Sequence, residues 1–326
     1  MNKKEIQKAW NTINLFTGHD YENESNIINS IIRYPKYIYR YRMINSKNLD
    51  MLEKNILYFS SADHYNDIHD TSFYFDVNKT LFELNKKFEI MNKDLSGTQK
   101  KLEKYFQMKI SKHDIQLRVN NKNIFYTIIS IMNAMRKLLR SNMQSICFSD
   151  TWKNYNLWSN YADSHRGFVL CFNTEDCFLD KNIKLFPIYY TEETYDAKDL
   201  IINVIAYTQT INSSLSSELK SNIMKHLYIN PWDWIKVSIL KKLDYETEKE
   251  WRIINLKPNK KRDYICLRPE YIILGEQINE NDMRRVIESA KKAHITKIYK
   301  AYKNISVNDE LTFSLLPDYS KQNIIY

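Results

Sequence analysis

The sequence predicts an α+β fold built on a mixed, partly antiparallel central sheet. Strand-like runs recur along the chain without a regular alternation of strands and helices, which argues against a doubly wound nucleotide fold. A long segment with helical spacing, at about residues 79–140, separates two strand regions and is predicted to be a helical insertion. The chain has only four glycines and contains neither common glycine-rich phosphate-binding motif.

The composition favours an anionic partner. Lys and Arg number 48 against 39 Asp and Glu, a formal net charge of +9, which favours a nucleotide, a nucleic acid or an acidic surface. The four cysteines show no C-x-x-C spacing, so we expect reduced, inert thiols and no metal site. The first residues lack an apolar signal segment, and no apolar run approaches the roughly 20 residues of a membrane span. We therefore expect a cytoplasmic protein without a membrane partner.

The region before the insertion combines helices and strands. Residues 1–34 are predicted to form a helical extension, and residues 35–326 a single α+β domain. Residues 36–42 alternate as a strand does, with three tyrosines on one side and Arg40 and Arg42 on the other. The pattern also predicts a helix at 45–55, a strand at 56–60 and a polar turn at 61–70.

After the insertion, short apolar runs predict further strands separated by helices. Within residues 150–165, Trp158, Tyr161, Ala162 and His165 are predicted to share one face of a helix. Pro231 is expected to begin a helix, because proline is favoured in a first turn. The remaining predicted elements are strands at 145–149, 168–172, 187–191, 264–267, 271–274 and 295–301, and helices at 199–228 and 280–293.

Residues 245–256 concentrate charge on what is predicted to be a buried strand. With a period of two, Glu246, Glu248, Glu250 and Arg252 share one face. Side chains two apart lie about 6.5 Å from each other, so like charges raise one carboxyl pKa unless a cation neutralises them. Such a pair suits proton transfer or stabilisation of a cation. The alternatives are a solvated strand face, and a helix end in which Glu248 pairs with Arg252.

The polar turn contains Asn66, Asp67 and Asp70. Side-chain hydrogen bonds to the turn backbone explain these residues. The alternative is a site in which Asp67, Asp70 and the distant glutamates bind Mg²⁺, which would make the protein a metal-dependent nuclease.

Several separated motifs resemble the bacterial family called domain of unknown function 2971 (DUF2971). The resemblance runs from about residue 36 to 302, apart from the insertion and a variable stretch near 192–230. Tyr65 and Ile68 depart from the family's turn, which usually has Phe and Pro there. In chain order the motifs are 39–41, 57–60, 65–67 with Asp70, 147–149, 157–167, 248–252 and 268–275.

A looser resemblance is to the ADP-ribosyltransferase fold, a split β-sheet that binds NAD in a cleft. Its members carry an Arg or His on the first strand, an aromatic or Ser motif on the middle strand and a Glu on a late strand. Arg40, the block 149–165 and the pair Glu248 and Glu250 follow that order. The resemblance implies an ADP-ribosyltransferase or NAD glycohydrolase with a protein or nucleic-acid acceptor, in a toxin or phage-defence setting.

The same resemblance implies roles for single residues. Glu250 would stabilise positive charge on the ribose as the nicotinamide bond breaks, and Glu248 would orient or deprotonate the acceptor. Arg40 would hold a pyrophosphate oxygen, and His165 would bond to the ribose. The residues expected to contact NAD are Arg40, Tyr41, Asn66, Asp67, Trp158, Tyr161 and Arg252, with Tyr161 or Trp158 stacked on the nicotinamide.

Each role has a structural alternative. Large aromatics such as Trp158 are more often core residues, and a lone histidine such as His165 is usually structural. Arg40 could pair with Glu248 or Glu250 across the sheet as a structural ion pair. In the absence of catalysis, the basic surface would make the protein a nucleic-acid-binding effector module.

Overall fold

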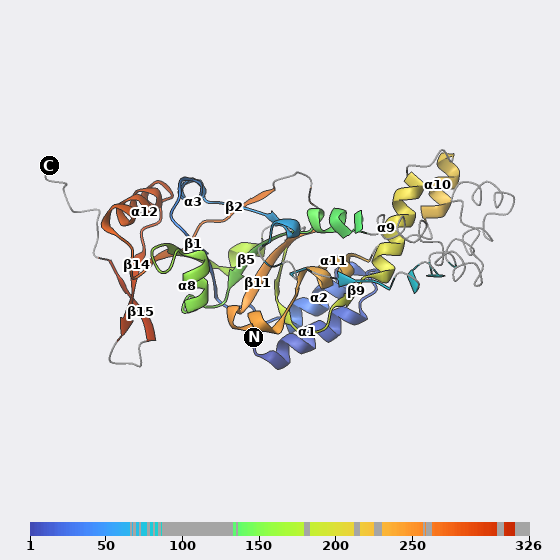
Figure 1. The fold of residues 1–326 in the computed structure, drawn as a ribbon, viewed down its shortest axis with the longest axis horizontal. Helices are drawn as coiled ribbons and strands as arrows, with labels where there is room; N and C mark the ends of the chain where they lie inside the picture. Colours follow the sequence, from blue (N-terminus) through green and yellow to red (C-terminus); the bar gives the residue numbers. More distant parts are fainter. Residues whose placement is uncertain are drawn as a thin grey trace.

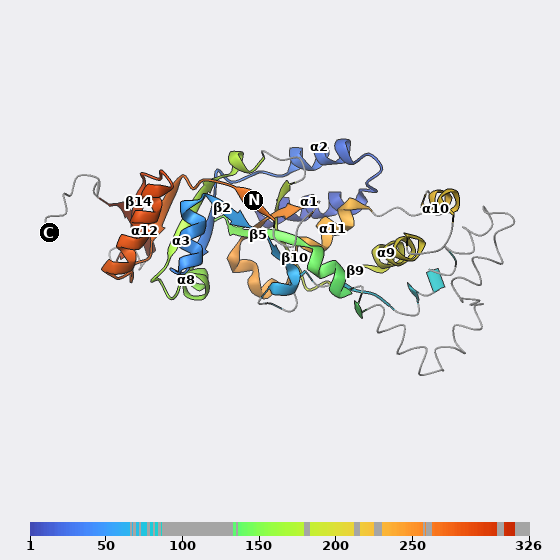
Figure 2. The same ribbon diagram turned by 90° about the horizontal axis from the view of Figure 1, so that it is seen from above.

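The computed structural model describes residues 1–65, 67, 70–71, 73–76, 79–80, 82–83, 86, 133–134, 136–178, 183–211, 216–224, 230–256, 258, 263–304 and 310–316. Helices and a mixed, largely antiparallel sheet confirm the predicted α+β class. The molecule is elongated, with the last strands at one end and the helices of residues 198–224 at the other (Figures 1 and 2).

The main sheet of the described residues has nine strands. They are β1 (Tyr37–Arg42), β3 (Ser60–Ser61), β5 (Gln144–Ser149), β6 (Phe168–Asn173), β7 (Ile183–Pro187), β11 (Glu250–Asn255), β13 (Tyr271–Leu274), β14 (Ile298–Asn304) and β15 (Glu310–Leu315). Across the sheet the order is β15, β14, β13, β6, β1, β5, β11 and β7, and β3 pairs with β5 beside this path. Of these pairs, only β13 with β14 is parallel.

Helices and short ribbons surround the sheet. The α-helices are α1 (Lys3–Leu15), α2 (Tyr21–Ile31), α3 (Ser46–Glu53), α8 (Tyr155–Tyr161), α9 (Lys198–Ile211), α10 (Ser217–Met224), α11 (Pro231–Ser238) and α12 (Glu280–Lys292). Single 3-10 turns are η1 (Ala62–His64), η2 (Thr174–Phe178) and η3 (Leu243–Glu248). Two-stranded ribbons pair β2 (Ile56–Tyr58) with β12 (Tyr264–Cys266), β4 (Phe73–Tyr74) with β9 (Tyr195–Asp196), and β8 (Tyr189–Tyr190) with β10 (Leu240–Lys241).

Polar caps fix where several helices begin. Asn2, Asn45, Asn154 and Asn279 each precede a helix and accept a hydrogen bond from a backbone N–H in its first turn. Such a side chain satisfies one of the donors that a helix start leaves unpaired. Pro231 occupies the first turn of α11, as predicted.

The sheet is split between β1 and β5. β1 pairs with β6 over its whole length but with β5 only where Tyr39 aligns with Ser149. Farther along β5, its partner is β3, with Ser60 opposite Ser145. The strands β1 and β5 therefore diverge beyond Tyr39, and side chains fill the seam between them.

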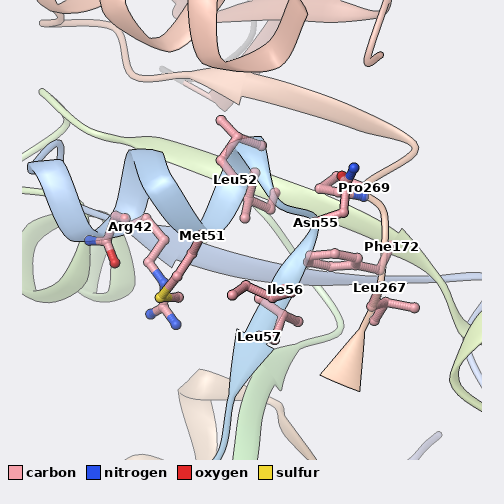
Figure 3. A pocket seen from close by; sticks show the side chains of 11 residues that line it. Arg42, Met51, Leu52, Asn55, Ile56, Leu57, Phe172, Leu267 and Pro269 are labelled. Carbon is pink, nitrogen blue, oxygen red and sulfur yellow. The ribbon is translucent and has the colours of Figure 1, made fainter. Parts of the chain in front are cut away.

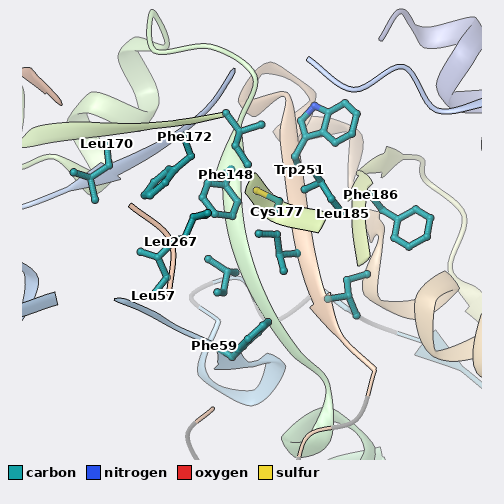
Figure 4. Close-up of a cluster of buried hydrophobic side chains, with 14 of the residues drawn as sticks. Leu57, Phe59, Phe148, Leu170, Phe172, Cys177, Leu185, Phe186, Trp251 and Leu267 are labelled. Atoms are coloured by element: carbon teal, nitrogen blue, oxygen red, sulfur yellow. The ribbon is translucent and has the colours of Figure 1, made fainter. Parts of the chain in front are cut away.

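The two faces of the sheet carry different cores. One face packs an aliphatic and aromatic cluster that includes Phe148, Phe172 and Trp251 (Figure 4), and α12 adds Val286 and Ala290 to it. The other face carries a second cluster that α8 covers; its members include Tyr39, Tyr41, Trp158, Val169 and Tyr271. The candidate site lies on this second face, because Tyr39 aligns with Ser149 and Ser149 with Glu250.

The predicted strand over residues 245–256 is wrong in its first half. Residues Leu243–Glu248 form η3, Lys249 has a left-handed φ of 46°, and β11 begins at Glu250. The ladder of β11 with β7 ends where Trp251 pairs with Pro187, since proline has no N–H to continue it. Glu246 and Glu248 consequently do not share a strand face with Glu250.

Other boundaries also differ from the prediction. The helix of the block 150–165 ends at Tyr161, and Asp163, Ser164 and His165 all have positive φ, so His165 lies in a tight turn and not on the helix face. The strand expected at 187–191 is divided between β7 and β8, and β15 was not predicted. Most of the predicted insertion at 79–140 lies outside the described residues, of which 136–142 are helical.

Gly275 is required where two loops meet, and its replacement should destabilise the fold. A Cβ added at Gly275 would lie 2.0 Å from the carbonyl oxygen of His165, and backbone cannot move aside as a flexible side chain can. We expect Gly275→Ala to lower the free energy of unfolding by about 3 kcal/mol, the upper end of typical overpacking costs. Urea denaturation measures this change, and a loss below about 1 kcal/mol would contradict the close approach.

Candidate functional site

A buried cluster of ions lies at the start of β11. Its five members are Asp70, Lys241, Glu248, Glu250 and Arg252, and they come from a turn, β10, η3 and β11. All but Glu248 are classed as buried, and Arg252 is only 1% exposed. Charged groups are seldom fully buried unless they are paired, and here each charge has an opposite partner.

Arg252 organises the centre of the cluster. Its Nη1 and Nη2 donate to the two carboxylate oxygens of Asp70 at 2.8 and 2.6 Å, a bidentate pairing. Its Nε donates to Glu250 Oε1 at 2.6 Å, and Nη1 also reaches the Ser238 carbonyl at 2.8 Å. The guanidinium lies 5.3 Å from the Tyr65 ring centroid. Arg252 therefore has no spare donor geometry for a ligand in this arrangement.

Lys241 links the two glutamates. Its Nζ donates to Glu248 Oε2 at 2.6 Å and to Glu250 Oε2 at 2.8 Å, and it lies 3.8 Å from Asp70 Oδ2. The two carboxylates therefore lie side by side about one ammonium group, although Glu248 belongs to η3 and Glu250 to β11. The adjacency predicted from a strand is present, and it is produced by a turn and a shared lysine.

The two glutamates have pKa values shifted in opposite directions. Burial raises the pKa of Glu250, but Arg252 and Lys241 outweigh burial and lower it to about 2. Burial raises the pKa of Glu248, and Lys241 only partly offsets this. A pair whose environments push the two pKa values apart is typical of an acid/base site. Glu250 is thus held as a carboxylate, while Glu248 is the member that exchanges a proton more readily.

This pairing predicts a pH dependence of stability. Because the folded pKa of Glu250 is below its usual 4.5, its stabilising contribution is complete above about pH 4.5 and is lost as the pH falls toward 2. Urea unfolding between pH 5.5 and 2.5 should show this decline, and Glu250→Gln should flatten it. The raised pKa of Glu248 acts in the opposite sense and is common to both proteins. Equal slopes for the two proteins would contradict the assignment.

A pocket of about 320 Å³ reaches Glu250. It lies between α1 and the start of β11, and its lining includes Asp150, Tyr190, Lys249, Glu250 and Trp251. The Tyr190 hydroxyl accepts a hydrogen bond from the Glu250 backbone N–H at 2.8 Å, and burial raises the pKa of Tyr190. This volume is at the lower end of the range of small-molecule sites.

Tyr161 faces the same cluster from α8. Burial raises its pKa to about 12, and the charges of Glu248, Lys241 and Glu250 also act on it. The residue is nevertheless 39% exposed. Of the two aromatics predicted to stack on a ligand, Tyr161 is the one with accessible surface near the carboxylates.

Arg40 and Arg42 leave β1 on the face opposite Glu250. Arg40 fills the seam of the split sheet, where its Nη1 donates to the Cys147 carbonyl at 2.7 Å. Burial lowers its pKa to about 10, and the charge of Glu250 raises it in part, so the two groups still interact. Burial also lowers the pKa of Arg42. Within the described residues, neither Nε has a hydrogen-bond partner.

Arg42 borders a second, much smaller hollow. It measures about 10 Å³ and is lined by Arg42, Asn55 and apolar side chains such as Met51 and Leu57 (Figure 3). That volume corresponds to about one water molecule and is too small for a phosphate group. The structure therefore places no pyrophosphate-sized space beside Arg42.

Three of the predicted site residues lie apart from the carboxylates. Trp158 is fully buried and donates from Nε1 to the Trp152 carbonyl at 2.7 Å. His165 stacks on Trp158 at 5.4 Å, and after burial the charges that shift its pKa are Glu276 and Lys303. Tyr41 is buried, with its hydroxyl donating to the Thr151 carbonyl at 2.9 Å. These placements correspond to the structural alternatives stated for Trp158 and His165.

The polar turn contributes one residue of the predicted set and one that had no ligand role. Asp70 is in the ion cluster through its pairing with Arg252. Asp67 is described and acts electrostatically on Tyr245 at the margin of the cluster. Asn66 lies outside the described residues.

Two contributors could not be identified from the sequence. Lys241 is one of many lysines, and only the parallel pairing of β10 with β8 brings it to the glutamates. Tyr190 is likewise one of 24 tyrosines. A signal of chemical role was absent in both cases, since neither residue belongs to a motif with a defined spacing.

A metal site is not formed by these carboxylates as they stand. Within the described ranges, no group of three His, Cys, Asp or Glu side chains is arranged to hold an ion. Asp70, Glu248 and Glu250 instead bind Arg252 and Lys241. The arrangement can retain one carboxylate in ionised form, exchange a proton at the other and admit a small ligand beside them.

The fold and the site define an α+β protein with a buried carboxylate pair beside a small pocket. The model of the family described as "Protein of unknown function (DUF2971)" matches residues 157–253, so this part of the chain belongs to the DUF2971 family, as predicted. The matched segment contains Tyr161, Lys241, Glu248, Glu250 and Arg252. Searches of the curated proteins and of the solved structures found no match. Among the helices that the structure describes, none has the length and apolar character for crossing a bilayer.

Proposed function

We propose that the protein cleaves the bond between nicotinamide and ribose in NAD, by hydrolysis or by transfer of ADP-ribose to an acceptor. The observation that supports this most directly is the carboxylate pair, in which Glu250 is held ionised and Glu248 has a raised pKa about one shared lysine. The reaction needs these two states, one to stabilise a cation and one to accept a proton.

The proposed chemistry assigns one task to each glutamate. The C–N bond breaks with its electron pair moving to the nicotinamide nitrogen, which neutralises the pyridinium and leaves positive charge on the ribose. Glu250 stabilises that charge more strongly than it stabilises the substrate. Water or another nucleophile then forms the new bond to the ribose carbon, and Glu248 accepts the proton that the nucleophile releases.

The pocket beside Glu250 supports a site for the nicotinamide and its ribose. Its volume suits that half of the dinucleotide. Tyr161 offers a partly exposed ring near the same charges, and we assign it the stacking contact. The proposal does not use Arg40 as a phosphate ligand, because Arg40 leaves the other face of β1 and is bonded to Cys147. An NAD-consuming activity in the cytoplasm would suit a toxin or phage-defence effector.

The direct test is release of nicotinamide. The purified protein is incubated with NAD and the products are separated by chromatography, with parallel incubations of DNA and RNA in the presence and absence of Mg²⁺. Nicotinamide released in proportion to protein supports the proposal, and ADP-ribose measured alongside it distinguishes hydrolysis from transfer. A protein that binds its substrates but releases no nicotinamide contradicts it, and Mg²⁺-dependent nicking would favour the nuclease alternative.

A second prediction concerns the proton acceptor. Because the pKa of Glu248 is raised above 4.5, the rate of nicotinamide release should increase with pH through a value above 4.5 as Glu248 loses its proton. In Glu248→Gln this acid limb should disappear while the Glu250 bonds to Arg252 remain. The pH profile of kcat measures the effect. An unchanged acid limb in the variant would show that another group controls it.

A further inference from the structure

A chain of aromatic rings lies on the same face of the sheet as Glu250, toward the other end. We call it the aromatic surface; its residues are Tyr37, Trp152, Tyr271, Tyr299 and Phe313. Tyr37 contacts Tyr271 at 5.7 Å between ring centroids, and Tyr271 contacts Tyr299 at 5.2 Å. Phe313 then joins Tyr299 at 4.8 Å to Trp152 at 4.9 Å.

Strand register fixes the position of this surface relative to the site. Tyr271 aligns with Cys171, which aligns with Tyr39, and Tyr39 aligns in turn with Ser149 and Glu250. The two regions therefore share one face of the sheet across four strand spacings, or about 19 Å at roughly 4.8 Å each.

The aromatic surface is only partly covered. α8 packs on the neighbouring part of this face through Leu157 and Trp158. Tyr37, Tyr299 and Phe313 are neither buried nor fully exposed, and the adjoining Leu315 is 58% exposed. Rings held in place by one another and still accessible are suited to stacking, because little conformational freedom is lost on binding.

Lysines stand at both ends of the aromatic surface. The Nζ of Lys36 lies 5.1 Å above the Tyr37 ring, and that of Lys153 lies 5.8 Å above the Trp152 ring. Both lysines are exposed. Glu270 is the acid of this region; it accepts from the Tyr37 hydroxyl and lies 3.6 Å from the ammonium of Lys297. The charge at the surface is thus positive, in keeping with the +9 of the whole chain.

We propose that the aromatic surface binds single-stranded nucleic acid. Unpaired bases stack on the accessible rings and the phosphates contact Lys36 and Lys153, which is the combination that single-strand binding without sequence preference requires. A duplex offers its phosphates but keeps its bases stacked, so it should bind more weakly. This inference is independent of the proposed NAD chemistry.

The test is fluorescence anisotropy with a labelled 20-nucleotide dT oligomer, the matching rU oligomer and a 20-base-pair duplex. We expect the full-length protein to prefer both single strands, and Tyr299→Ala to weaken binding of the dT oligomer by about tenfold. The matched control is Tyr302→Ala, since Tyr302 is 42% exposed on the same strand but points to the opposite face. Tyr299→Phe should retain binding.

A second pair of variants keeps the test decisive if Tyr299→Ala fails to fold. Replacing the exposed Lys36 and Lys153 by glutamate should weaken binding and reduce the salt dependence of the affinity by about two phosphate contacts. The control pair is Lys8→Glu with Lys291→Glu, which are exposed on α1 and α12. Equal binding of duplex, equal loss in the control pair, no binding to either single strand, or binding only to anionic lipid vesicles would each overturn the proposal.

Discussion

Replacing Glu250 by glutamine is expected to lower the rate of nicotinamide release from NAD by about 10²- to 10³-fold, the usual effect of removing one electrostatic stabiliser of a transition state. Glutamine has nearly the same shape but carries no charge, so the positive charge that develops on the ribose loses its counterion. The effect should appear in kcat more than in KM, because the carboxylate acts on the transition state and not equally on the substrate. Steady-state kinetics with chromatographic detection of nicotinamide measures both constants.

The matched control for this change is Glu288→Gln. Glu288 is exposed on α12, remote from the ion cluster along the chain and on an element that packs against the other face of the sheet. It should leave kcat unchanged. Circular dichroism and thermal unfolding of both variants separate a chemical effect from loss of structure, since Glu250 is also bonded to Lys241 and Arg252. A folded Glu250→Gln protein with undiminished kcat would remove Glu250 from the mechanism.

Replacing Arg252 by methionine is expected to lower the free energy of unfolding by about 3–5 kcal/mol, the usual cost of removing one partner of a buried ion pair. Methionine fills much of the same volume, so the loss reflects charge more than packing. The change leaves Asp70 without its bidentate partner and leaves Glu250 with Lys241 alone. Urea denaturation followed by circular dichroism gives the difference in unfolding free energy.

A surface arginine provides the comparison. Arg284 lies 3.7 Å from Glu280, and both side chains are highly exposed, so Arg284→Met should change stability by no more than about 0.5 kcal/mol. If Arg252→Met were equally mild, the cluster would contribute little to the fold. Its retention would then have to be explained by function alone.

Local pattern predicted much of the secondary structure. The alternation of tyrosines and arginines located β1, the continuous apolar run at 168–172 located β6, and Asn45 with regular leucines located α3. Each signal depends on neighbours within one or two turns or along one strand, which is the range over which periodicity is informative. The error at residues 245–249 arose because an alternating charge pattern also fits a 3-10 turn, and the ladder with Pro187 decides where the strand begins.

By itself, the sequence determined the α+β class, the family motifs and the two glutamates that matter, because these follow from residue type and local spacing. Only the tertiary structure decided which charges meet. It brought Lys241 and Asp70 to Glu250, placed Arg40 on the opposite face of β1 and separated His165 from the carboxylates. The physical reason is that strand register and buried ion pairing depend on contacts between residues up to 182 positions apart, and no local pattern encodes such contacts.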